Sequence, residues 1–269
     1  MNLEAFAAQH VPALERDEAR HNLLLAIVSN AIAKPAADLR WWSLGRPGAC
    51  AVRAAKRPIV LGALDEAECL RLAAELHGSD YPGVVGSGET AVWFAGRAEA
   101  LGATFAERIP QPILKIEKPP QFPGAPGTSR PVTGEDAALF AEWRLAFARE
   151  ATPQDPAPQR DALEKTAASG DHLFWIVDGA PVSLASIGRR TRNGAVINGV
   201  YTPPALRGRG YAGSVTAALV ERGYAEGKTF ACLYVDRRNP ASNRCYAKIG
   251  FAPICDGWHC VRGPVGKGD

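Results

Sequence analysis

Residues 200–213 constrain the fold more than any other part of the chain. They begin with β-branched and aromatic residues, pass a Pro-Pro corner, and enter a glycine-rich turn before a helix-compatible run over 211–226. Glycines let a ligand approach the backbone closely, and the first N–H groups of a helix have no partner within it. Strand, glycine loop and helix start therefore predict an anion site, to which Arg207 and Arg209 add positive charge.

One interpretation of this loop is a dinucleotide site. Gly208, Gly210 and Gly213 spell G-x-G-x-x-G, and Asp236 follows a strand-like run as a ribose-binding acid would. This alternative predicts an NAD(P)-binding oxidoreductase. Against it, the five-residue corner 203–207 separates the strand from the first glycine, and few residues remain for the rest of a Rossmann half.

A second interpretation fits the same loop better. The segment 207–212, Arg-Gly-Arg-Gly-Tyr-Ala, matches R/Q-x-x-G-x-G/A, and it resembles the pyrophosphate loop of the GNAT acyl-CoA-dependent N-acyltransferases. Residues 236–251 resemble the second signature of that family, in which a strand ends in Asn, a short helix carries a Tyr, and Gly-Phe closes the motif. The resemblance covers about residues 130 to 262.

The second motif is also a good helix in its own right. Asn239 is a favourable N-cap, Pro240 a favourable first helical residue, and Gly250 a natural left-handed stop. Tyr246 lies two turns after Asn239 and so projects from roughly the same side. The alternative to a functional Tyr246 is a structural aromatic residue whose ring packs in the fold and whose hydroxyl is exposed to solvent.

The resemblance implies an N-acetyltransferase that moves an acetyl group from acetyl-CoA to a primary amine of a small molecule or amino acid. In the resembled family the strand before the glycine loop splays from its neighbour. Here that part of the strand, Val200 to Thr202, would hold the pantetheine arm and offer backbone N–H groups to the thioester oxyanion. Tyr246 would be the general acid that protonates the departing thiolate. The alternative outside enzymology is a catalytically silent acyl-CoA-binding module. The residues implied in cofactor binding are Val200, Tyr201, Thr202, Arg207, Gly208, Arg209, Gly210, Tyr211, Ala212, Gly213, Asn239 and Tyr246.

The general base is left open. Some relatives carry a carboxylate early in the strand before the glycine loop, but 195–200 contains neither Asp nor Glu. Asn198 could order a water there instead. His172, Glu142 and Glu150 are further candidates, each with an ordinary structural alternative: a histidine inside a strand, or glutamates that face solvent.

Composition is that of an ordinary globular enzyme. Apolar residues make up 46% and charged residues 22% of the 269, and the net charge of +3 is too weak to predict nucleic-acid binding. No apolar run approaches the 18 residues of a membrane span. The acidic residues near the N-terminus are unlike a signal peptide. We expect a cytoplasmic monomer or homodimer.

The cysteines predict no metal site. Cys255 and Cys260 flank His259, an arrangement that suggests a metal site. No second ligand pair of recognisable spacing accompanies them, so reduced thiols are the simpler interpretation.

A proline-rich stretch, 118–127, divides the chain because proline neither continues a helix nor sits in a central strand. The predicted organisation is an N-terminal α/β domain, a linker and a catalytic domain, with bounds 1–117, 118–130 and 131–269. In the first domain the glycine-rich turn 81–88 precedes a helix, 89–101. This order resembles a degenerate acyltransferase copy without the Arg-x-x-Gly-x-Gly loop; a generic α/β lid is the alternative.

The second half predicts an α/β fold. Helices over 134–151 and 160–168 precede a hairpin turned at Asp178-Gly179, a dipeptide that favours tight turns. With the strand 195–202 and the elements described above, the order resembles that of the GNAT acyltransferases, and this resemblance implies a mixed, mostly antiparallel sheet with helices on both faces.

Overall fold

The computed structural model describes residues 1–34 and 38–263, so the end of the predicted catalytic domain, 264–269, lies outside the described residues. The chain divides into two compact units. Of the described residues, the first contains Met1–Ile113, Val235–Arg238 and 253–263, and the second contains Leu114–Tyr234 and Asn239–Ala252. These bounds differ from the predicted ones mainly because the last strand of the chain belongs to the sheet of the first unit.

The first unit is built on a six-stranded sheet in the order β1-β2-β3-β4-β13-β5. Only β3 and β4 pair in parallel. Its helices are α1 (Leu3–Leu14), α2 (Glu18–Ala33), α3 (Glu66–Glu75) and α4 (Thr90–Ala100), with a short 3-10 helix η1 at Glu15–Asp17. Its strands are β1 (Arg40–Ser43), β2 (Cys50–Arg53), β3 (Ile59–Leu61), β4 (Gly83–Ser87), β5 (Phe105–Pro110) and β13 (Gly257–Arg262).

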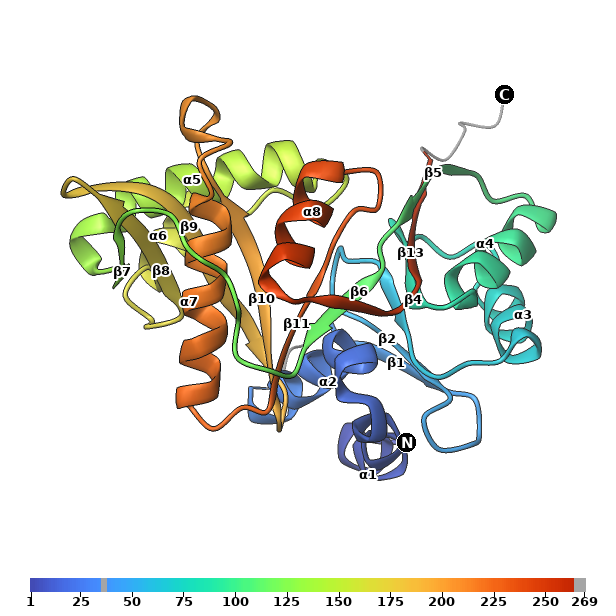
Figure 1. Ribbon diagram of the computed structural model, residues 1–269. Coiled ribbons are helices and arrows are strands. Elements are labelled where there is room, and N and C mark those ends of the chain that lie inside the picture. The colour runs from blue at the N-terminus through green and yellow to red at the C-terminus, as the bar shows by residue number, and fades with distance from the viewer. Residues whose placement is uncertain (35–37, 264–269) are drawn as a thin grey trace. The chain divides into compact units, whose positions relative to one another are not determined.

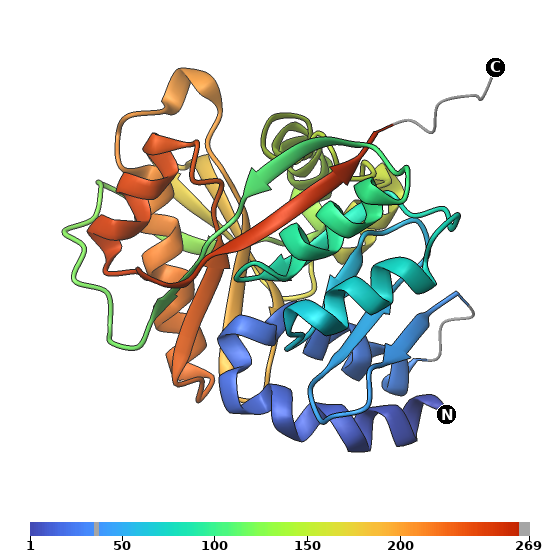
Figure 2. The same cartoon turned by 90° about the vertical axis from the view of Figure 1, so that its right-hand side faces the viewer.

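The strand β13 completes this sheet between β4 and β5, and Figure 2 shows it in red among strands from the start of the chain. It pairs antiparallel with both neighbours. A Cβ added at Gly83 would lie 2.5 Å from the Cys260 carbonyl oxygen, so glycine permits the close approach of β4 to β13. The predicted glycine-rich turn 81–88 is therefore wrong for 83–87, which form β4 and pair along their whole length.

The second unit is built on a seven-stranded sheet in the order β12-β6-β11-β10-β9-β8-β7. Its strands are β6 (Ile113–Ile116), β7 (Thr128–Pro131), β8 (His172–Val177), β9 (Ala180–Arg190), β10 (Gly194–Tyr201), β11 (Phe230–Tyr234) and β12 (Ala252–Cys255). Its helices are α5 (Ala137–Ala151), α6 (Arg160–Thr166), α7 (Tyr211–Ala225) and α8 (Pro240–Ile249), with 3-10 turns η2 (Gly134–Asp136) and η3 (Pro204–Leu206).

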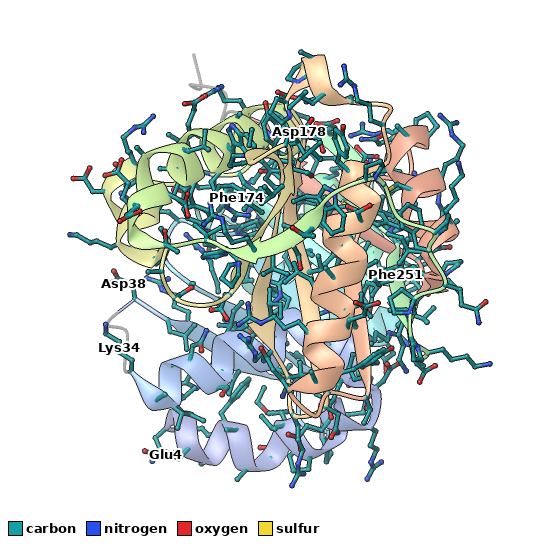
Figure 3. The ribbon with its side chains drawn as sticks, turned by 60° about the vertical axis from the view of Figure 1, so that its left-hand side comes forward. Glu4, Lys34, Asp38, Phe174, Asp178 and Phe251 are labelled. Carbon is teal, nitrogen blue, oxygen red and sulfur yellow. The ribbon has the colours of Figure 1, made fainter. Side chains whose placement is uncertain are left out.

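Helices cover both faces of this sheet, as the sequence predicted (Figure 1). On one face Phe140 and Trp143 of α5 pack with Phe174 of β8 in a buried cluster, and Phe174 is labelled in Figure 3. On the other face α7 lies so close that a Cβ at Gly223 would meet Ala195 of β10 at 3.2 Å. The strands β10 and β11 run parallel, whereas the successive pairs β7–β8, β8–β9 and β9–β10 are antiparallel. A doubly wound parallel sheet is excluded, and the dinucleotide-binding alternative with it.

The two units repeat one order of elements. The series α1-α2-β1-β2-β3-α3-β4-α4-β5-β6 corresponds to α5-α6-β8-β9-β10-α7-β11-α8-β12-β13, and each series has its parallel pair at the same place. The last strand of each series lies in the sheet of the other: β6 beside β11 and β12, and β13 beside β4 and β5. The two halves have thus exchanged their final strands.

No helix in the part of the chain that the structure describes is both long and apolar enough to cross a membrane. Within the same residues no group of three or more His, Cys, Asp or Glu side chains is placed to hold a metal ion.

Candidate active site

The strand β10 separates from its parallel neighbour partway along its length. It pairs with β11 at Gly194–Val196 only, although it continues to Tyr201. The register of β10 with β9 shifts between Asn198, which pairs with Ser186, and Tyr201, which pairs with Leu184. Over this stretch β10 advances by three residues while β9 advances by two. The extra residue is a β-bulge, a feature that bends a strand and interrupts its ladder. The stretch predicted to hold the thioester, Val200 to Thr202, begins at this bulge.

The glycine loop leads from β10 into α7 in a conformation that presents backbone N–H groups. Gly208 and Gly210 both have left-handed φ angles, +80° and +84°, and Gly210 is the N-cap of α7 without any side-chain cap. The first helical bond is donated by Ser214 N–H to the Gly210 carbonyl at 3.1 Å. Among described residues no acceptor takes the N–H groups of the three residues that begin α7, Tyr211, Ala212 and Gly213. An uncapped helix start of this kind attracts an anion.

Arg207 is held at the base of the loop rather than extended from it. Its Nε donates to the Thr202 carbonyl at 2.9 Å, and its Nη2 donates to Glu150 Oε2 at 2.6 Å. Tyr201 donates its hydroxyl to the same carboxylate at 3.3 Å. Glu150 at the end of α5 thus joins Tyr201 and Arg207, and Arg207 in turn bonds Thr202. Arg209 is exposed, with one weak contact to the Ala205 carbonyl at 3.5 Å.

The predicted linker lies across the start of α7 (Figure 1, green). The Phe122 ring packs directly on Gly213, where a Cβ would meet it at 2.5 to 3.1 Å. The Ala125 N–H donates to Ser214 Oγ at 2.7 Å. Residues 128–131 of this segment form β7, which pairs with β8. The proline-rich segment therefore contributes to the surroundings of the loop as well as connecting the two halves.

Tyr246 and Asn239 belong to α8, which packs against α7 (Figure 1). As predicted from its residues, this helix is capped by Asn239, whose Oδ1 accepts from Ser242 N–H at 3.1 Å, and ends at Gly250 with φ of +111°. Tyr246 is half-buried with its ring edge-on to Phe251 at 6.0 Å, and no described residue hydrogen-bonds its hydroxyl. Burial, and secondarily Cys245, raise the pKa of Tyr246 above its ordinary value, so it stays protonated at neutral pH.

The four candidates for the general base have different surroundings. His172 Nδ1 lies 2.8 Å from Ser186 Oγ, and burial together with the nearby Arg144 charge lowers its pKa to about 4. Glu150 is engaged with Arg207 and Tyr201, and Glu142 is exposed. Asn198 accepts a hydrogen bond and has no proton-accepting carboxylate. None of these residues is identified as the base.

Arg144 is a site residue that the sequence reasoning missed. Its guanidinium lies over the bulge in β10: a Cβ added at Gly199 would overlap Nη1 and lie 2.6 Å from Cζ. Nη1 also donates to Asn198 Oδ1 across a long 3.4 Å. The available signal was an arginine between Trp143 and Leu145, inside the apolar run of the predicted helix.

The equivalent helix start in the first unit is closed to anions. In α3 the Asp65 carboxylate accepts from Glu68 N–H at 2.8 Å, and Glu68 accepts from Asp65 N–H at 2.9 Å, which is a capping box. These N–H groups are occupied, and two carboxylates lie where the glycine loop of the second unit presents none. Asp236, the ribose-binding acid of the dinucleotide alternative, accepts from the side chain of Arg238 at 2.9 to 3.2 Å.

Comparison with known proteins agrees with this geometry. The model of the acetyltransferase (GNAT) family matches residues 137–251. A GCN5-related N-acetyltransferase from Kribbella flavida is 20% identical with a TM-score of 0.59, over 92% of this chain and 96% of that chain. A tandem GNAT protein from the clavulanic acid biosynthesis pathway is 14% identical with a TM-score of 0.53, over 90% of this chain and 88% of that chain. No curated protein matches the sequence.

The residues that match the acetyltransferase (GNAT) family, 137–251, contain the bulged strand β10, the glycine loop and the uncapped start of α7. Residues 137–251 form an acetyltransferase domain of the GNAT family, and the two units together have the fold of a tandem GNAT protein.

Proposed function

We propose that this protein is an N-acetyltransferase that transfers an acetyl group from acetyl-CoA to a primary amine of a small molecule or amino acid. The observation that carries the proposal is the uncapped start of α7, reached from the splayed β10 through two left-handed glycines. Such a start suits a pyrophosphate, because its N–H groups and helix dipole both favour negative charge. The loop 203–213 contains no acidic residue that would oppose it.

We assign each candidate site residue a role from its position in the structure. The loop 207–213 would hold the pyrophosphate, and the unpaired edge of β10 at 200–202 would hold the pantetheine arm and donate an N–H to the oxyanion. Phe122 and Ala125 would border the bound cosubstrate, since they lie against the same helix turn. Tyr246 would protonate the leaving thiolate, and Asn239 would keep α8 in position through its cap.

Binding at the loop is tested by Gly210→Asp. This change places a side chain and a negative charge where the pyrophosphate would lie. Calorimetric titration should therefore show a large loss of CoA affinity. Gly227→Asp is the matched control, because Gly227 also has a left-handed φ, +82°, and lies at the opposite end of α7 with nothing within 4 Å. Equal CoA affinity of both variants and the parent would remove the proposal.

Turnover separates the enzyme from a silent acyl-CoA-binding module. A panel of primary amines and amino acids is incubated with acetyl-CoA, and released thiol is measured. Protection against heating by acetyl-CoA with no thiol release from any acceptor would favour the module. The rest of the proposal is a cytoplasmic monomer or homodimer without nucleic-acid partners; the net charge of +3 supports the last point.

A further inference from the structure

Arg144 is a partly buried arginine that has no carboxylate partner among the described residues. Arg130 pairs with Asp136 at 2.7 Å and Arg207 with Glu150 at 2.6 Å. Among described residues Arg144 forms no ion pair, and its one hydrogen bond is the 3.4 Å contact to Asn198. Its guanidinium also lies 5.7 Å from the Phe147 ring centroid.

This lack of a partner is unusual because the side chain is partly buried. Burial lowers the pKa of Arg144, yet a guanidinium remains charged at any pH a folded protein experiences. A buried charge without a counter-ion is unfavourable, and removal of a guanidinium from water is normally offset by a carboxylate or phosphate. The neighbouring ionisable group, His172, is neutral at pH 7 and offers no negative charge.

The position of the guanidinium places it beside the reaction centre of the proposed function. It lies on Gly199, directly before Val200 to Thr202, the stretch proposed to hold the thioester. It reaches β10 from α5, whereas the glycine loop continues into α7 on the opposite face of the sheet. A group bound by Arg144 would therefore approach the strand from the side away from the pyrophosphate loop.

We propose that Arg144 binds the carboxylate of the acceptor, so that the acceptors of this enzyme are amines that carry a carboxylate, such as amino acids. The inference rests on the proposed function and narrows its substrate class. The planar guanidinium matches a carboxylate with two parallel N–H···O bonds, and Asn198 holds it in place. The amine nitrogen attacks the thioester carbonyl carbon, the C–S bond breaks, and the amine loses one proton while the thiolate gains one. The carboxylate is unchanged.

The experiment compares matched acceptors, each amino acid against its carboxamide, in the parent and in Arg144→Gln. The parent should prefer the carboxylate, and the variant should lose about 10- to 100-fold in kcat/KM for the carboxylate acceptor only, as for a charge-assisted hydrogen bond. KM for acetyl-CoA should not change. Arg149→Gln, an exposed arginine of the same helix, is the control and should keep the preference. Arg144→Lys should restore part of it.

A second variant keeps the Arg144 guanidinium but gives it an internal carboxylate partner. Asn198→Asp supplies an internal carboxylate at the position that Asn198 Oδ1 holds now, and it should raise KM for carboxylate acceptors while KM for the amides stays as in the parent. Equal losses for acids and amides in Arg144→Gln would show that Arg144 acts on the acetyl group or on folding, and the inference would be wrong.

Heat stability gives a readout independent of turnover. With CoA bound, amino acids should raise the melting temperature of the parent more than their amides do, and Arg144→Gln should abolish the difference. No difference in the parent overturns the carboxylate inference while CoA binding still stands. Loss of CoA binding itself is measured separately and concerns the proposed function.

Discussion

Tyr246 combines two properties that a general acid requires. Its hydroxyl is not committed to another residue of the described chain, and its raised pKa keeps the proton in place at neutral pH. A fully solvated tyrosine would also be protonated at pH 7, so the useful part of the environment is the absence of a competing hydrogen bond.

Tyr246→Phe should lower kcat by about 10²-fold, the low end of general acid catalysis, because a thiolate is a fair leaving group. The ring contact with Phe251 survives in the variant, so KM for acetyl-CoA and the melting temperature should be nearly unchanged. Steady-state kinetics from pH 6 to 9 measure this. Parental turnover throughout that range would make Tyr246 a packing residue.

Substitution of two glycines with left-handed φ distinguishes the cost of backbone strain from the cost of side-chain overlap. Gly199 has φ of +59° with the Arg144 guanidinium where a Cβ would be, whereas Gly208 has φ of +80° with nothing within 4 Å. Gly208→Ala should lower the free energy of unfolding by about 1–2 kcal/mol, the strain of a left-handed alanine. Gly199→Ala should lower it further because Arg144 must move. Urea unfolding without CoA measures both, and equal losses would contradict the overlap.

The loop residues of the candidate site could be named from the sequence because they are consecutive. The motif from Arg207 to Gly213 lies in one stretch, and in the structure Gly208 and Gly210 have left-handed φ angles. Arg144 and Asn198 lie 54 positions apart, and only the packing of α5 on β10 brings them together. No local pattern distinguishes Arg144 from an arginine that reaches solvent along a helix.

At the scale of elements, β7 is tied to the beginning of α5 by a two-pronged ion pair. Arg130 donates to both oxygens of Asp136 at 2.7 and 2.9 Å, and the Thr133 N–H donates to the same carboxylate at 2.8 Å. The Arg130 hydrogen bonds, followed by those of Thr133, hold the pKa of Asp136 well below its ordinary value, against an opposing effect of burial.

Asp136→Asn should lower the free energy of unfolding at pH 7 by about 1–3 kcal/mol, since hydrogen bonds to a charged group are lost. A depressed native pKa stabilises the fold above the unfolded value of about 4, and this contribution is lost as the pH falls below it. The difference between parent and variant should therefore be constant from pH 7 to 5 and shrink below pH 4. Denaturant titrations from pH 7 down to pH 2 measure it; a difference at pH 2 as large as that at pH 7 would mean that charge is not responsible.

Elements with strong local signals were predicted well. The helix predicted over 211–226 is observed as Tyr211–Ala225, and Asp178 and Gly179 both have positive φ at the hairpin turn. The strands β5 and β7 were missed because half of the residues of β5 and three of the four residues of β7 are exposed, and neither strand has an apolar alternation. β13 was missed for a different reason: its partners lie near the other end of the chain.

Across the whole molecule, the two halves share an order of elements but differ at the equivalent helix starts. That of α7 is open, whereas that of α3 is closed by the Asp65–Glu68 capping box. We therefore expect the chain to bind one acetyl-CoA. Calorimetric titration should give a stoichiometry near one per chain, and Gly210→Asp should abolish all of the heat. A residual second site in that variant would contradict the closed state of α3.

The exchange of final strands reverses the usual order in which a two-part protein matures on the ribosome. Nascent chains generally fold from the N-terminal part onward, as each part emerges. Here the strand that fills the gap between β4 and β5 is β13, which is translated after every other strand. Until β13 has been translated, β4 and β5 have unsatisfied edges, which are the features of a sheet most prone to wrong pairing. The sheet of the first unit is thus completed only after the strands of the second unit have been made.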